Sequence, residues 1–160
     1  PTFGKGGLLW ASLTLALLAV LAFLSGCAPL ISEFNADAYK NATTLKAETL
    51  ALVDKSGEAY ATRRIEVETL TTKIDAAYEY AAGLPANQIT AQQWQILRNP
   101  EGRLYGSFVR IWRTRGKVGD EYRVEKKAQL AEAYDLIICL EVNKKESKSC
   151  SSIAAAGPKE

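Results

Sequence analysis

The chain has 160 residues, of which 48% are hydrophobic and 24% are charged. This composition excludes a disordered or collagen-like protein, and the length predicts a single domain. The chain contains 20 Lys and Arg against 18 Asp and Glu, and the resulting net charge of +2 argues against nucleic acid as a partner. It contains no histidine, so it lacks the usual general base and the commonest zinc ligand.

An apolar segment lies near the start of the chain. Lys5 and two glycines precede residues 8–24, which carry no charge. A basic start, an apolar stretch and then small residues are typical of a secretory signal peptide. Here the stretch ends in Leu24, Ser25, Gly26 and Cys27.

These four residues resemble the lipobox of bacterial lipoproteins, and the resemblance covers residues 5–27. It implies that the signal peptide 1–26 is cleaved and that Cys27 carries a diacylglyceryl group and a further acyl group, which are the only covalent cofactors expected. Two or three acyl chains hold a protein on a membrane durably. Ala28 follows the cysteine, where enterobacterial members retained in the inner membrane have Asp, so the outer membrane facing the periplasm is the expected location. The alternative is an uncleaved membrane helix.

The chain beyond the signal divides into three parts. Residues 27–35 are the lipidated cysteine and a tether, residues 36–143 a helical domain, and residues 144–160 a flexible polar tail. No segment alternates with period two, so we expect an all-α fold after the signal helix, either an antiparallel helical bundle or an elongated helical hairpin. This region is also similar to small helical lipoproteins of Gram-negative bacteria, a resemblance that implies no function.

Two amphipathic patterns follow the tether. Small and apolar residues recur at intervals of three and four from Ala38 to Ala59. A heptad pattern then comprises Tyr60, Val67, Leu70, Ile74, Ala77 and Ala81. We expect one long helix kinked at Gly57, although this glycine could also end one helix and start another. Gly83, in the left-handed cap conformation, and Pro85 are expected to end it.

Three further helices are expected. Thr90 and Gln93 have the spacing of a capping box, which predicts a short helix over 90–97. A turn precedes a third helix that ends at Gly116, and Asp120 is the expected N-cap of the last helix. The predicted seam of that last helix consists of Val124, Ala131, Tyr134 and Ile138, and Leu130, Ile137 and Leu140 broaden it.

The two remaining cysteines are Cys139 and Cys150. In an oxidising compartment they can pair, and their spacing lets the tail fold back onto the last helix, so we expect a disulfide. The alternative is a buried free Cys139 and an unpaired Cys150. We expect no metal site, because two sulfurs without histidine fall short of four ligands.

A cationic stretch without Asp or Glu contains Arg103, Arg110, Arg113, Arg115 and Lys117, whereas residues 28–82 hold nine carboxylates against six cations. The favoured interpretation is that these arginines pair with the acidic helices inside the bundle. The alternative is that Arg110, Arg113 and Lys117 share one helix face and, together with Trp112, bind phosphates of a lipid or glycan.

Nothing in the sequence indicates catalysis, since it has no Gly-rich phosphate loop, nucleophile elbow or suitably spaced carboxylate pair. We expect Trp94, Tyr105, Phe108 and Trp112 in the core. We therefore expect a membrane-anchored envelope lipoprotein with a structural or protein-interaction role. The alternative is a binding module for an anionic envelope component, a lipid headgroup, lipopolysaccharide or glycan, through residues 103–117. The surface expected for a protein partner is the seam of Tyr60, Val67, Leu70 and Ile74.

Overall fold

The computed structural model describes residues 32–146 and Cys150, which belong to the compact unit Ile31–Glu160. The expected signal peptide and lipobox lie outside the described residues. The described chain forms, in order, α2 Ala36–Asp54, the short 3-10 helix η1 Lys55–Gly57, α3 Tyr60–Gly83, α4 Gln88–Arg98, α5 Tyr105–Arg115 and α6 Asp120–Glu146. It has no strand, so the expected all-α fold is confirmed over this range. None of its helices is both long and apolar enough to span a bilayer.

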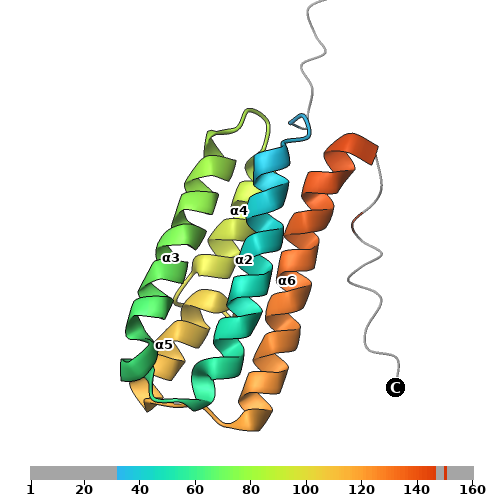
Figure 1. The fold of residues 1–160 in the computed structure, drawn as a ribbon. Coiled ribbons are helices and arrows are strands. Elements are labelled where there is room, and N and C mark those ends of the chain that lie inside the picture. Colours follow the sequence, from blue (N-terminus) through green and yellow to red (C-terminus); the bar gives the residue numbers. More distant parts are fainter. Residues whose placement is uncertain (1–31, 147–149, 151–160) are drawn as a thin grey trace, which may run out of the picture. The chain divides into compact units, whose positions relative to one another are not determined.

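The helices pack side by side as a bundle. Figure 1 shows α2 lengthwise between α3 and α6, while α4 and α5 follow each other along the remaining position. α2 contacts both α3 and α6, and α4 contacts the same two helices from the other side. The broken helix α4–α5 therefore completes the enclosure of one core.

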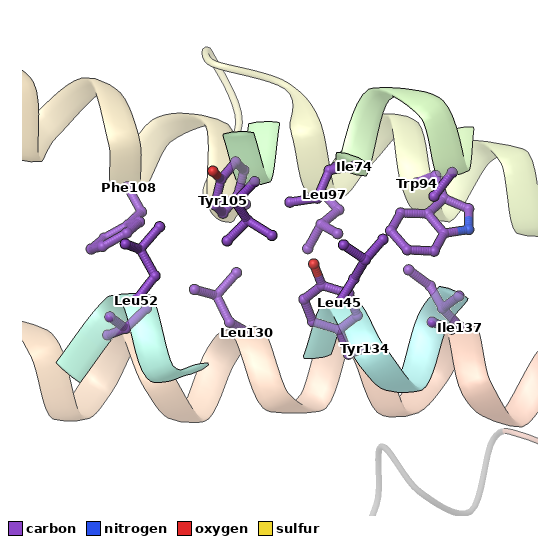
Figure 2. Packing of buried hydrophobic residues seen from close by; sticks show 14 of the residues in the cluster. Leu45, Leu52, Ile74, Trp94, Leu97, Tyr105, Phe108, Leu130, Tyr134 and Ile137 are labelled. Atoms are coloured by element: carbon purple, nitrogen blue, oxygen red, sulfur yellow. The ribbon is translucent and has the colours of Figure 1, made fainter. Parts of the chain in front are cut away.

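That core is built from leucines, isoleucines and aromatic rings of all five α-helices (Figure 2). The aromatic residues expected in the core, Trp94, Tyr105, Phe108 and Trp112, are all buried. One polar contact crosses the core, where the hydroxyl oxygens of Thr49 and Tyr134 lie 2.8 Å apart. This contact satisfies two buried groups that would otherwise be costly to desolvate.

The expected single long helix through Gly57 is wrong, because the chain reverses at this glycine. η1 ends α2, and Glu58 and Ala59 are extended before α3 begins. A Cβ at Gly57 would lie 2.8 Å from a guanidinium nitrogen of Arg123. The Trp112 indole N–H also donates to the Glu58 carbonyl at 3.1 Å. The corner is thus stabilised by residues far along the chain, and Ala59, expected in the apolar stripe, is exposed.

The turn between α3 and α4 also differs from expectation. Gly83 is the last residue of α3, and the left-handed conformation falls on Ala86, with φ of 54°. The capping box does not form: α4 begins at Gln88, and Thr90 is buried inside it. Asn87 precedes the helix and uses its side-chain amide to donate to the Ala81 carbonyl at 2.9 Å. At the end of α5, in contrast, Gly116 has φ of 78°, a backbone conformation that favours glycine.

The expected face of α6 is buried only in part. Of its expected residues, Leu130, Tyr134 and Ile137 are fully buried, whereas Val124 is 72% exposed. Ala131 and Ile138 lie at the margins. Asp120 is the first helical residue, and its carboxylate pairs with Arg123 instead of capping the helix. The helix also continues to Glu146, beyond the expected boundary at residue 143.

Candidate functional site

α5 presents a cationic face because of the spacing of its apolar residues. Tyr105, Phe108 and Trp112 are buried, at intervals of three and four, so they fix one side of the helix against the core. Arg110 and Arg113 are therefore exposed on the other side. Lys117 follows the helix and is also exposed. Cations near a helix C-terminus are favoured by the partial negative charge of its free carbonyls.

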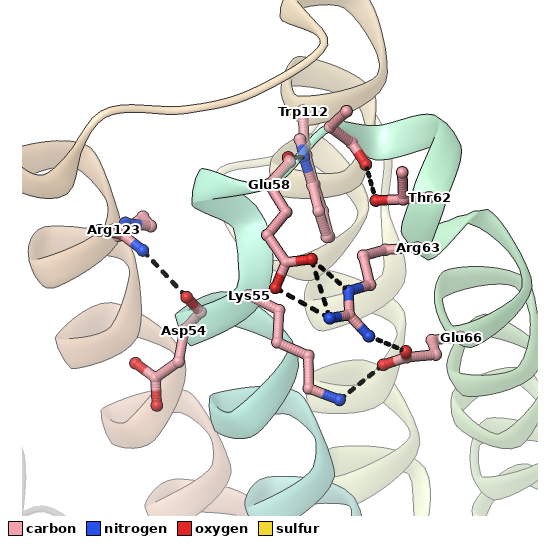
Figure 3. Close-up of polar contacts among 9 residues, drawn as sticks. Asp54, Lys55, Glu58, Thr62, Arg63, Glu66, Trp112 and Arg123 are labelled. Atoms are coloured by element: carbon pink, nitrogen blue, oxygen red, sulfur yellow. Dashed lines mark hydrogen bonds and ion pairs between the residues drawn. The ribbon is translucent and has the colours of Figure 1, made fainter.

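These cations do not pair with the acidic helices, so the favoured interpretation from the sequence is wrong. Six carboxylates on α2, on α3 and in the corner between them have other partners: Glu48 pairs with Lys73, Asp54 with Lys127, Glu58 and Glu66 with Arg63, Glu68 with Arg64, and Asp75 with Arg98. Figure 3 shows Arg63 between Glu58 and Glu66, with Lys55 donating to Glu66 at 2.7 Å. Of the cationic stretch, Arg110 alone has a described ion-pair partner, Glu101 at 4.0 Å.

Trp112 does not belong to this exposed face, which corrects its assignment to an anion site. Its side chain is fully buried, and its ring meets Tyr60 edge-on at 5.6 Å and Phe108 at 5.7 Å between centroids. Its N–H is already used by the Glu58 carbonyl (Figure 3). Trp112 therefore anchors α5 in the core and leaves the arginines to face solvent.

A pocket of about 370 Å³ opens beside two of these arginines, between α3, α4 and α5. Arg110 and Arg113 line it, and so does Arg98 at the end of α4. Its apolar wall comes from Ile74 and Val109. A volume of this order suits a small ligand or one unit of a polymer.

Arg98 is held in a fixed position in this pocket. It donates to the Asp75 carboxylate at 2.8 Å and to the Gln95 amide oxygen at 3.1 Å. Its guanidinium carbon also lies 4.1 Å from the centre of the Tyr78 ring, a cation–π distance. The Arg98–Asp75 pair is thus neutral overall, and the net positive charge of the pocket comes from Arg110 and Arg113.

The pocket depends on a close approach between α4 and α5. A Cβ on Gly106 would lie 2.2 Å from the carbonyl oxygen of Arg98, so only glycine fits. Asn99 stabilises the connecting turn by accepting from the Glu101 N–H at 2.9 Å. Arg110 donates to the carbonyl of Pro100 at 3.0 Å. The turn and the arginine are therefore fixed together.

Two tyrosines near the arginines remain protonated at neutral pH. Burial raises the pKa of Tyr105, an effect that its hydrogen bond with Thr71 opposes. Burial also raises the pKa of Tyr122, while the charge of Arg115 and, more weakly, that of Arg110 lower it. Neither hydroxyl supplies a negative charge that would neutralise the cationic face.

The seam expected to receive a protein partner is already covered. Val67, Leu70 and Ile74 are buried within the bundle. Tyr60 is half-buried against Trp112. A partner helix could reach these residues only if the bundle opened. The most exposed large hydrophobic residue of α3 is Ile65, at 72%, beside a groove between α2 and α3.

The last helix carries the other predicted site. The structure joins Cys139 and Cys150 in a disulfide, with Cα atoms 5.7 Å apart. Five residues beyond Cys139, Lys144 donates to Glu141 at 2.7 Å and to the Asn87 side chain at 2.6 Å. The side chains of Lys144 and Glu141 are almost completely buried, so a buried ion pair connects the end of α6 to Asn87 before α4.

Neither metal ligands nor relatives identify the site. Within residues 32–146 and Cys150, no group of three or more Cys, Asp or Glu side chains could hold a metal ion. No protein-family model matches the chain, and no curated protein or solved structure is similar enough to count as a relative.

Several pocket residues were missed in the sequence, namely Thr71, Asp75, Gln95, Arg98, Asn99 and Gly106. They lie on three helices and in the turn after α4, and nothing in their spacing indicates that they meet. Gly106 offered a signal, since a glycine inside an amphipathic helix often marks a close backbone approach.

Proposed function

We propose that this chain is a lipid-anchored envelope protein whose helical bundle binds an anionic envelope component without catalysis. The observation that carries the binding proposal is the exposed set of cations on and after α5, none of which pairs with a carboxylate of the acidic helices α2 and α3. Only Arg110 of this set has a described ion-pair partner, Glu101 of the neighbouring turn. Guanidinium groups recognise phosphate and carboxylate groups through paired, charge-assisted hydrogen bonds. The structural or protein-interaction role loses its main support, since its expected seam is buried.

The lipid anchor rests on the lipobox resemblance, with Cys27 as the modified residue and the outer membrane as the proposed location. Intact mass of the protein extracted from membranes tests it. We expect a chain that begins at Cys27 and carries acyl groups, and Cys27→Ser should abolish the modification. A chain that begins at Lys5 or earlier and carries no lipid would contradict the anchor.

The end of α5 lies far from the first residue of α2. The 19 residues of α2 extend about 28 Å. The end of α5 lies at the far end of α2, where the Val118 N–H donates to the Ser56 carbonyl at 3.1 Å. Lys117, which follows α5, therefore lies near the end of α2 that is opposite to its first residue, Ala36.

The binding proposal is tested with the full chain held in nanodiscs of neutral phosphatidylcholine. The probe is the phosphorylated core oligosaccharide released from lipopolysaccharide, which has no acyl chains to insert into the bilayer. We expect binding that weakens as salt rises. The triple variant Arg110→Gln, Arg113→Gln and Lys117→Gln should lose about tenfold or more in affinity, since hydrogen bonds between charged groups are the strong ones.

The matched control removes the same charge elsewhere. Lys40, Arg64 and Lys73 are exposed on α2 and α3, and their triple change to Gln should alter affinity by less than about threefold. Equal losses in both triple variants would mean that net charge alone drives binding. Unchanged binding in the α5 variant, with its helical circular dichroism preserved, would overturn the proposal.

A further inference from the structure

We infer that the pocket between α3, α4 and α5 binds the phosphate monoester of a sugar. This inference rests on the proposed function and names the chemical group that its anionic partner presents. It uses the pocket of about 370 Å³ lined by Asp75, Gln95, Arg98, Asn99, Arg110 and Arg113.

The charge of the pocket fits a dianion. Arg98 is neutralised by Asp75 at 2.8 Å, so this pair adds no net charge. Arg110 lies 4.0 Å from Glu101, whose side chain is 79% exposed, and it contributes one positive charge on the pocket side. Arg113 has no described hydrogen-bond or ion-pair partner and contributes the second. A phosphate monoester carries a charge between about −1.5 and −2 at neutral pH.

The polarity of the uncharged groups also favours phosphate. The side-chain oxygen of Gln95 accepts from Arg98 at 3.1 Å, and that of Asn99 accepts from the Glu101 N–H at 2.9 Å. Both amide NH₂ groups are left without a described partner. The amides and arginines therefore offer N–H donors, which suit the acceptor oxygens of phosphate.

The size and lining of the pocket indicate what carries the phosphate. Inorganic phosphate would fill only part of this volume, and the wall formed by Ile74, Gly106 and Val109 is apolar. A sugar ring presents C–H groups to such a wall and hydroxyl groups to the two amides. Free sugar phosphates and phosphorylated sugars within a glycan share this chemistry.

Two isosteric variants test the inference. Asn99→Asp and Gln95→Glu each keep the oxygen that accepts the internal hydrogen bond and replace the free NH₂ by a negatively charged oxygen. Each should weaken binding of glucose 6-phosphate to the full chain in neutral nanodiscs by about tenfold or more, measured by calorimetry. Gln92→Glu is the matched control, because Gln92 is exposed on α4, as Gln95 is, but lies outside the pocket lining. The affinity of this variant for glucose 6-phosphate should stay within about threefold of that of the native chain.

The comparison of ligands separates the outcomes. Glucose should not bind. If the phosphorylated core oligosaccharide binds more tightly than the same oligosaccharide after enzymatic removal of its phosphates, a glycan is identified as the source of the phosphate. Equal weakening in Asn99→Asp and Gln92→Glu, or equal binding of glucose and glucose 6-phosphate, would overturn the inference. If glucose 6-phosphate fails to bind while the α5 triple variant still loses oligosaccharide binding, the pocket assignment fails and the proposed function stands.

Discussion

Gly106 of α5 lies directly against the backbone of Arg98, the last residue of α4. A Cβ at position 106 would be 2.2 Å from the Arg98 carbonyl oxygen and 2.5 Å from the carbonyl carbon of Asn99. Backbone atoms cannot swing away as a flexible side chain can. This contact sets the distance between α4 and α5 and therefore the shape of the pocket between them.

Gly106→Ala should destabilise the fold, because the added methyl group must displace backbone. We expect a loss of about 1–3 kcal/mol in the free energy of unfolding, measured by urea titration. Gly83→Ala is the control, since a Cβ there meets nothing within 4 Å and alanine favours the helix. Its stability should rise by about 0.5–1 kcal/mol or stay unchanged. Equal effects of the two substitutions would contradict the close contact.

Thr49 and Tyr134 form the polar contact that crosses the core. Tyr134→Phe removes one hydroxyl and leaves the other buried without its partner, 2.8 Å from where the phenol oxygen stood. We expect Tyr134→Phe to lower the free energy of unfolding by about 1–3 kcal/mol. The double variant with Thr49→Val should lose less stability than the sum of the losses in the two single variants. Additive losses in a double-mutant cycle would mean that the two hydroxyls do not interact.

Glu66 should make stability depend on pH in the acid range. Hydrogen bonds from Lys55 and then Arg63 hold the pKa of its carboxylate below the ordinary value in the folded protein. The unfolded chain therefore binds the proton more readily, so this contribution is present above the ordinary pKa of Glu and is lost as pH falls through the folded pKa.

The measurement compares unfolding of the native chain and Glu66→Gln between pH 7 and pH 2. We expect the stability difference between them to shrink as pH falls. Glu79→Gln serves as a control because Glu79 is exposed and has no described ion-pair partner. A difference that is constant across this range would rule out the proposed linkage of Glu66 to Lys55 and Arg63.

The disulfide should staple the end of α6. Cys139 and Cys150 are eleven residues apart, and the lost loop entropy of the unfolded chain corresponds to about 2–3 kcal/mol. We expect Cys139→Ser with Cys150→Ser, or reduction of the native chain, to lower the free energy of unfolding by this amount. Under denaturing conditions, thiol labelling should modify both cysteines only after reduction. Labelling without reduction would show that the pair is open.

Local periodicity predicted the helices but not how they meet. The heptad from Val67 to Ala81 correctly marked a buried face, because seven-residue spacing keeps side chains on one side of a helix. The corner at Gly57 was not predictable, since it depends on Arg123 and on Trp112, both more than fifty residues away. A local rule weighs a glycine only against its sequence neighbours.

The candidate site was predictable only in part. The sequence placed Arg110 and Arg113 on one helix face, and the structure leaves both exposed. Trp112 was expected in the core, and only the alternative that placed it beside the arginines is wrong. Adjacent residues on a helix lie about 100° apart, so Trp112 faces the core while Arg113 faces solvent. Predicting the ion pair of Asp75 with Arg98 requires knowing which helices are in contact. The same contacts determine which carboxylates already have a cationic partner.

The most direct test of the account is photo-crosslinking in living cells with a photoreactive residue at Thr114. This exposed position lies on the face of Arg110 and Arg113 and leaves every cation in place. Thr72 on α3 is the matched control, since it too is exposed and its hydroxyl donates to the carbonyl four residues earlier, as that of Thr114 does. We predict phosphorylated glycan or glycolipid adducts from position 114 and none from position 72. A discrete protein adduct from position 72, with no anionic adduct from position 114, would contradict the account.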